Sequence, residues 1–233
     1  MIKSKQVLFV VLVTLLFSVS VLAQRDSDSA RDLIKSGNAK YARAEYEAAL
    51  EDYRLVAPSA GQVYAQALYN IGVCYYELWR TEDAVAMYRK AIEVSDGRYV
   101  KAYYSLGVAL EDLKRFAEAK QAYLQAVAAS EGTHAFAYFR LGVITASEGD
   151  SDAAATLFKQ ALSRSKEAFP NSHNNLGVML ARRGRLHEAK REFEIALSQS
   201  KGTLPEAQYN LELCHSLLKS PIRVQLIAEL VIK

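Results

Sequence analysis

The sequence predicts an all-α fold, a solenoid of five helix pairs followed by a degenerate sixth unit that closes the stack. Three observations predict it. Glycines recur every 35 residues, alanines and aromatic residues follow them at the same period, and the 233-residue chain is 51% hydrophobic and 24% charged, as ordinary folded chains are. A fixed period of this length indicates a stack of supersecondary units, because a single unit cannot bury its apolar face alone.

The first 23 residues have a composition of their own and predict a secretory signal peptide. Lys3 and Lys5 precede an apolar run, and small residues follow up to Ala23, after which we expect cleavage. The alternative is an uncleaved membrane anchor over residues 7–23, because these 17 residues come close to the length of about 20 that a helix needs to span a bilayer. No cysteine follows the apolar run, so a lipid anchor is not expected. We therefore expect an exported protein, periplasmic or secreted, with no stable membrane insertion after cleavage.

A short linker over residues 24–29 leads into the repeats, which are predicted over residues 30–219. The repeat units lie near 30–64, 65–99, 100–134, 135–169 and 170–204, with a cap at 205–219. Their glycine column is Gly37, Gly72, Gly107, Gly142 and Gly177.

Each unit is predicted to be two amphipathic helices. An alanine stands twelve residues after each glycine, an aromatic residue four later, and a small or apolar residue three after that, which is the spacing of one helix face. Glycine inside the first helix costs about 1 kcal/mol relative to alanine. It indicates that the second helix of the unit approaches closely there, and we expect the aromatic residue to fill the gap between neighbouring units.

Helix ends are marked as well. Glycine ends the triplets Ser95-Asp96-Gly97, Ser130-Glu131-Gly132 and Ser200-Lys201-Gly202, where a left-handed residue can stop the second helix, and Pro170 and Pro205 open the first helices of the next units. Ser220 and Pro221 predict a last short helix or tail over residues 220–233, with apolar residues on both faces. This segment either buries itself against the cap or serves as a docking or dimer surface.

The repeat resembles the tetratricopeptide family. The pattern is clearest in two runs, Leu68…Ile71-Gly72…Tyr75…Ala84…Tyr88…Ala91 and Tyr103…Leu106-Gly107…Leu110…Ala119…Tyr123…Ala126. The period is 35 rather than the commoner 34, and the usual proline at the unit end is missing. The resemblance implies a right-handed superhelix whose concave groove, lined by the first helices, holds an extended segment or helix of a partner protein. The layout also resembles bacterial repeat lipoproteins that assist outer-membrane or pilus assembly.

The expected partner-binding groove follows from the position of each residue relative to the glycine. Three residues before it stand Ile34, Tyr69, Tyr104, Phe139, Asn174 and Tyr209. One residue after it stand Asn38, Val73, Val108 and Val143, and two residues before it stand Asn70, Arg140, Asn175 and Asn210. Aromatic side chains are typical of interaction hot spots, and amides can bind a partner's backbone without reading its sequence. The alternatives are that some of these side chains are buried in the core and that the asparagines do not bind a partner.

No catalytic chemistry is predicted. The sequence contains no phosphate-binding glycine loop, no nucleophile elbow and no metal-type spacing of Cys or His, so we expect no enzyme, no cofactor and no metal site. Cys74 and Cys214 share a column otherwise held by residues such as Ala39 and Met179, which favours buried structural thiols. Without residues 1–23, 27 basic residues face 26 acidic ones, which argues against a nucleic-acid partner.

The sequence therefore predicts a non-enzymatic scaffold or assembly factor that binds another protein or a peptide segment in its groove. The alternative is a structural subunit that forms homo-oligomers through the apolar tail or the ends of the solenoid.

Overall fold

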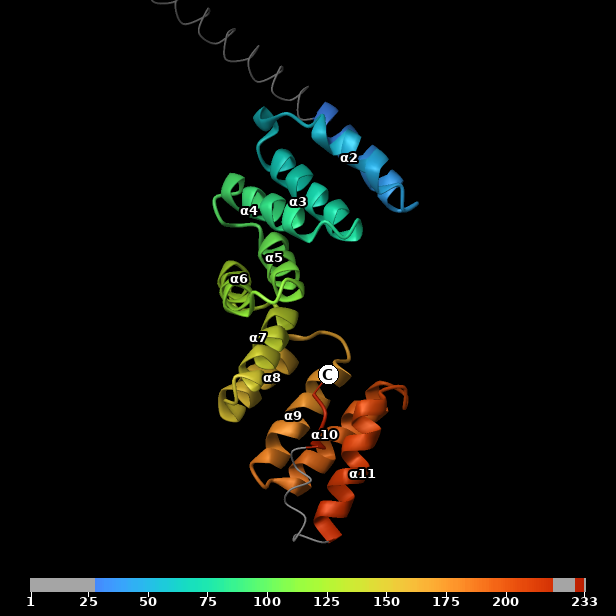
Figure 1. Cartoon of the computed structure of the whole chain (residues 1–233), viewed down its shortest axis with the longest axis vertical. Coiled ribbons are helices and arrows are strands. Elements are labelled where there is room, and N and C mark those ends of the chain that lie inside the picture. The colour runs from blue at the N-terminus through green and yellow to red at the C-terminus, as the bar shows by residue number, and fades with distance from the viewer. Residues whose placement is uncertain (1–27, 220–228, 233) are drawn as a thin grey trace, which may run out of the picture. The chain divides into compact units, whose positions relative to one another are not determined.

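The computed structural model describes residues 28–219 and 229–232, and every regular element in these ranges is helical. This confirms the all-α class and the solenoid of helix pairs (Figure 1). The predicted signal peptide lies outside the described residues, as does most of the predicted linker. Residues 28 and 29 are already helical, so the linker is shorter than the predicted 24–29. None of the described helices is long and apolar enough to cross a bilayer.

The chain divides into two compact units, which we describe separately. The N-terminal unit ends at Arg115 and contains the helical residues 28–41, α2 (Tyr46–Arg54), the short 3₁₀ helix η1 (Pro58–Ala60), α3 (Gln62–Glu77), α4 (Thr81–Val94) and α5 (Val100–Asp112).

The C-terminal unit begins at Phe116. It contains α6 (Phe116–Ala129), α7 (Ala135–Ser147), α8 (Ser151–Arg164), α9 (Pro170–Arg182), α10 (Leu186–Gln199) and α11 (Pro205–Lys219). Pro170 and Pro205 open α9 and α11 as predicted, because the missing N–H of proline would have no partner in the first helical turn anyway.

The repeat core is built on the contact between a glycine and an aromatic ring. A Cβ atom added at Gly72 would lie 2.6 Å from Cε1 of Tyr88, and one at Gly177 would lie 2.6 Å from Cε1 of Phe193. The close approach of the two helices is therefore confirmed. The rings of Tyr53, Tyr88, Phe158 and Phe193 thus pack on the glycine of their own repeat. Contact with the neighbouring repeat, as expected, is made as well: Tyr53 belongs to a buried cluster with Ile71 and Cys74, and Arg140 donates to the Tyr123 hydroxyl over 3.4 Å. Tyr88 and Phe193 are 2% and 0% exposed.

The turns between helices use left-handed backbone. Gly97, Gly132 and Gly202 have φ of 72°, 75° and 77° and end the second helices as predicted. The turn between the two helices of each repeat also needs one left-handed residue, seven positions after the glycine of that repeat. The residues there are Ala44 (φ 59°), Trp79 (60°), Lys114 (60°), Gly149 (93°) and Gly184 (74°).

The end of the chain differs from the predicted last helix. Residue 229 has 3₁₀ geometry and residues 230–232 have no helical structure. The last described residues therefore form a tail rather than a helix. Residues 220–228 lie outside the described part of the chain.

Candidate functional site

In the N-terminal unit, the first helices α3 and α5 present a partly exposed aromatic and apolar surface. Tyr69 and Val73 of α3, and Tyr104 and Val108 of α5, are all half-buried. The ring of Tyr69 packs 5.7 Å from that of Tyr88 and 5.1 Å from that of Tyr99, measured between centroids. Rigid, partly exposed aromatic rings of this kind offer a large contact area at little entropic cost.

Hydrogen bonds between residues 36 apart tie consecutive first helices together along this surface. The Tyr69 hydroxyl lies 3.4 Å from Ser105 Oγ, Tyr41 donates to Glu77 over 3.1 Å, and Tyr76 donates to Asp112. Burial, with the bond to Glu77, raises the pKa of Tyr41 to about 12, so its phenol keeps the proton that it donates.

Tyr41 and Tyr76 were not among the predicted groove residues. A signal was present, because a tyrosine four residues after one glycine is matched by an acid five residues after the next. These tyrosine–carboxylate pairs make the edge of the surface polar and acidic.

The first repeat shows a correction. Ile34 is only 5% exposed and belongs to a core cluster with Leu50 and Tyr53, so it is not groove surface. Asn38 is exposed, and its side-chain oxygen accepts from Tyr53 over 2.7 Å and from the Asn70 amide over 3.1 Å. The sequence places Asn38 and Asn70 in different columns, yet the fold brings them together.

Phe139 of α7 is a second correction. It is 7% exposed, and its ring packs 5.9 Å from Phe158 and 5.0 Å from Phe169, so it belongs to the core. Its neighbours in the predicted groove, Arg140 and Val143, are half-buried. Arg140 donates to the Tyr123 hydroxyl over 3.4 Å.

The first helices of the last two repeats, α9 and α11, bind a segment of the chain itself. Residues 229–232, the C-terminal segment, lie beside α9 and α11 (Figure 1). Asn210 of α11 binds the backbone of Val231 at both ends: its amide donates to the carbonyl over 2.8 Å and its oxygen accepts from the N–H over 2.8 Å. Asn174 of α9 donates a further bond to the same carbonyl over 3.1 Å.

The two asparagines also position each other. The Asn210 amide donates to the Asn174 oxygen over 2.8 Å, and the Asn174 amide donates to the oxygen of Asn175 over 3.1 Å. All three side chains are fully buried. Since buried polar groups need partners, this network fixes the amides in the orientation that binds the backbone N–H and carbonyl of one residue.

Apolar and acidic contacts complete the hold on the C-terminal segment. Leu230 is 4% exposed and belongs to the same buried cluster as Phe139 and Val178, with Ile232 packed against its edge. Tyr209, 43% exposed, donates to the Glu229 carboxylate over 3.3 Å. Of the two interpretations left open for the tail, its last described residues follow the first, burial against the cap.

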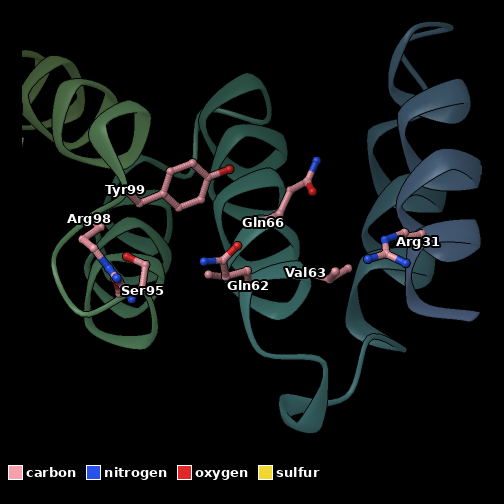
Figure 2. A pocket seen from close by; sticks show the side chains of 8 residues that line it. Arg31, Gln62, Val63, Gln66, Ser95, Arg98 and Tyr99 are labelled. Carbon is pink, nitrogen blue, oxygen red and sulfur yellow. The ribbon is translucent and has the colours of Figure 1, made fainter. Parts of the chain in front are cut away.

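The N-terminal unit also contains a shallow depression of about 450 Å³. Figure 2 shows Arg31 on the first helix, Gln62 and Gln66 on α3, and Arg98 on the opposite side of α3 from Arg31. Arg31 pairs with Asp28 over 2.8 Å and Arg98 with Asp96 over 3.4 Å. The two guanidinium groups therefore do not converge on one point.

Both cysteines are fully buried and free, as predicted for structural thiols. Burial raises the pKa of Cys74 to about 11, which keeps it a thiol at neutral pH. The Cys214 thiol donates to the carbonyl of Leu186 over 3.3 Å. In the described part of the chain, no three His, Cys, Asp or Glu residues gather as a metal site.

Comparison with known proteins supports the repeat family. The tetratricopeptide repeat family matches residues 27–97, 80–134 and 139–202. No curated protein matches the sequence. A crystal structure of MamA is 25% identical, covers 71% of this chain and 94% of its own, and gives a TM-score of 0.61.

Two further solved structures share the fold. The pilF protein of Pseudomonas aeruginosa is 19% identical over 86% of this chain and 90% of its own, with a TM-score of 0.69. YrrB, described as a tetratricopeptide protein with an unusual peptide-binding site, is 22% identical over 81% of this chain and 94% of its own, with a TM-score of 0.57. At these identities the likeness shows the fold.

Proposed function

Because this chain belongs to the tetratricopeptide repeat family, whose members bind other proteins or peptides, we propose that it is a non-enzymatic scaffold or assembly factor that binds a partner segment along its first helices. The observation that carries the proposal is the hold on the C-terminal segment. Asn174 and Asn210 bind the backbone N–H and carbonyl of Val231, which is how a groove accepts an extended segment without reading its side chains.

The N-terminal unit supplies the surface for the partner in this proposal. Tyr69, Val73 and Tyr104 offer partly exposed aromatic and apolar area on α3 and α5. The carboxylates of Glu77 and Asp112 lie on the same helices and accept from tyrosines. A partner segment that places an apolar side chain on the tyrosines and a basic one near the carboxylates fits this surface.

The compartment proposed for this function is an exported one, periplasmic or secreted, and the support is the composition of residues 1–23. Mass spectrometry of the protein made in its native cell tests this. A mature N-terminus at Gln24 supports export with cleavage, whereas an intact N-terminus in the membrane fraction favours the anchor over residues 7–23, and an intact N-terminus in the soluble fraction contradicts export.

The binding surface is tested by crosslinking in the native compartment, using the unmodified protein and a Tyr69→Ala/Tyr104→Ala variant. We expect the variant to lose a specific crosslinked protein. Its circular dichroism spectrum should stay that of a helical protein and its unfolding should stay cooperative. A Leu55→Ala/Trp79→Ala variant is the matched control, because these exposed side chains, 68% and 92% accessible, lie in the same unit outside the predicted groove columns. Equal capture by all three proteins contradicts the proposed surface.

A further inference from the structure

We propose that the C-terminal segment, residues 229–232, is a built-in competitor: it occupies a peptide site between α9 and α11, and an extended peptide of the same chemistry from a partner protein binds there only by displacing it. This rests on the proposed function and adds the chemistry of the ligand and the regulation of its site. Three steps support it.

The first step is the recognition of the backbone of one residue, Val231, through both its N–H and its carbonyl. Asn210 offers a donor to the Val231 carbonyl and an acceptor to the Val231 N–H, and Asn174 offers a second donor to the carbonyl. All these contacts are to backbone atoms, so any residue with an N–H can stand at this position. Proline is excluded, because it has no N–H to donate to Asn210.

The second step is the side-chain pattern around Val231. Leu230 is buried and Ile232 is partly buried, while Val231 between them is 39% exposed. The alternation of buried and exposed side chains is that of an extended segment. With the Glu229 carboxylate accepting from Tyr209, the site fits a ligand of the order acidic, apolar, any residue except proline, apolar.

The third step is that the segment holds the site by proximity. The described contacts come from four residues, and nine residues of sequence connect them to the end of α11 at Lys219. A segment tethered so closely competes at an effective concentration on the order of millimolar. The apparent affinity of a free ligand is then its affinity for the open site multiplied by the fraction of molecules whose site is open. For a peptide with a dissociation constant of about 10–100 µM, we expect a reduction of about 10–100-fold.

The test uses the full chain and a labelled peptide with the sequence of residues 228–233. Its binding is measured by fluorescence anisotropy to the unmodified chain and to a Leu230→Asp/Val231→Pro variant, which removes the buried side chain and the N–H of the tethered segment. We expect the variant to bind the peptide about 10–100-fold more tightly. Equal affinity, or no saturable binding to the folded variant, overturns the proposal.

Two controls place the binding at the asparagines. In the variant background, Asn210→Asp keeps the acceptor but loses the donor, and should weaken peptide binding. Asn70→Ala changes the same column in the N-terminal unit and should leave binding unchanged; equal losses in both contradict the assignment.

A peptide with proline in place of Val231 should not bind either protein. If mass measurement shows that the unmodified chain is a dimer whose Leu230→Asp/Val231→Pro variant is a monomer, the segment acts between two copies and the competitor role is wrong.

One measurement requires no variant. In the unmodified chain, we expect the bond from the Val231 N–H to Asn210 to slow amide exchange at Val231, and an excess of unlabelled peptide to accelerate it. Unchanged exchange contradicts displacement. This inference can fail while the proposed function stands. Partner capture that depends on Tyr69 and Tyr104 without any effect of the peptide would leave the function standing and remove this inference.

Discussion

The two units carry the same repeat columns on their first helices but leave them in different states. In the column three residues before the glycine, Tyr69 of the N-terminal unit is half-buried, whereas Asn174 of the C-terminal unit is fully buried. In the column one residue after the glycine, Val73 is half-buried and Val178 is fully buried. The C-terminal segment binds Asn174 through Val231, and its Leu230 shares a buried cluster with Val178. Burial in a repeat column thus depends on what covers it as well as on its position.

The largest effect should show what the two units have in common. We predict that Tyr88→Ala in the N-terminal unit and Phe158→Ala in the C-terminal unit each lower the free energy of unfolding by about 3–5 kcal/mol. Both rings are at most 2% exposed and lie on the glycine of their own unit, Gly72 and Gly142. Urea unfolding measures the loss, with Phe116→Ala, 49% exposed, as the control. A loss below about 1 kcal/mol in one unit would show that the two cores are not equivalent.

The next effect tests the difference between the units. We predict that Leu230→Ala lowers the free energy of unfolding by about 1–2 kcal/mol, because it removes most of a buried side chain that holds the C-terminal segment. Val231→Ala is the matched control, since that side chain is 39% exposed and its contacts to asparagine are made by backbone atoms. Thermal unfolding and limited proteolysis of the C-terminus compare them. If the two variants behave alike, the segment does not stabilise the C-terminal unit through Leu230.

A smaller effect comes from the turn inside each repeat. The N-terminal unit places Trp79 at φ 60°, where the C-terminal unit places Gly184 at φ 74°. We predict that Trp79→Gly raises the free energy of unfolding by about 1 kcal/mol and that Gly184→Ala lowers it by about the same amount, since only the left-handed backbone is affected. No atom would crowd a Cβ at Gly184, and Trp79 is 92% exposed. Chemical denaturation with changes of the same sign in both variants would refute this account.

The smallest effect belongs to the first repeat alone. The hydrogen bond from the Lys40 ammonium to the Asp52 carboxylate, 2.8 Å long, lowers the pKa of Asp52. The pair therefore stabilises the fold above the ordinary aspartate pKa, about 3.9, and this stability is lost as the pH falls through the lowered value. We predict that Asp52→Asn costs less than about 1 kcal/mol at pH 7 and that the difference shrinks at acid pH. A difference that is constant from pH 7 to pH 3, measured by urea unfolding, would exclude the pair as its source.

Much of the fold could be predicted from the sequence, because it depends on local chemistry that repeats. The glycine and aromatic columns, the left-handed glycines and the prolines at helix starts each act within a few turns of helix, and periodicity shows which residues share a role. The predicted exposure of Ile34 and Phe139 was wrong. Both stand in a groove column, yet Phe139 is surrounded by Phe158 and Phe169, which lie on other elements of the same unit.

The site was predicted less completely than the fold. The asparagines two residues before the glycine were identified as groups that could bind a partner's backbone, and one of them, Asn210, binds the backbone of the chain's own Val231. Asn174, which binds the same carbonyl, stands three residues before the glycine, in the column predicted as an aromatic and apolar floor. The hydrogen bonds between Tyr41 and Glu77 and between Tyr76 and Asp112 were missed, because each joins two columns offset by one position.

The sequence by itself determined that this is a repeat of helix pairs, since a period of 35 residues fixes which side chains share a helix face and where each helix ends. It also determined the buried thiols and the supply of amides on the first helices. Only the tertiary structure decided which of those amides are engaged and by what. The C-terminal segment is 21 residues from Asn210 and 57 from Asn174 at its point of contact, and a bond over such separations depends on how the helices stack rather than on any local pattern.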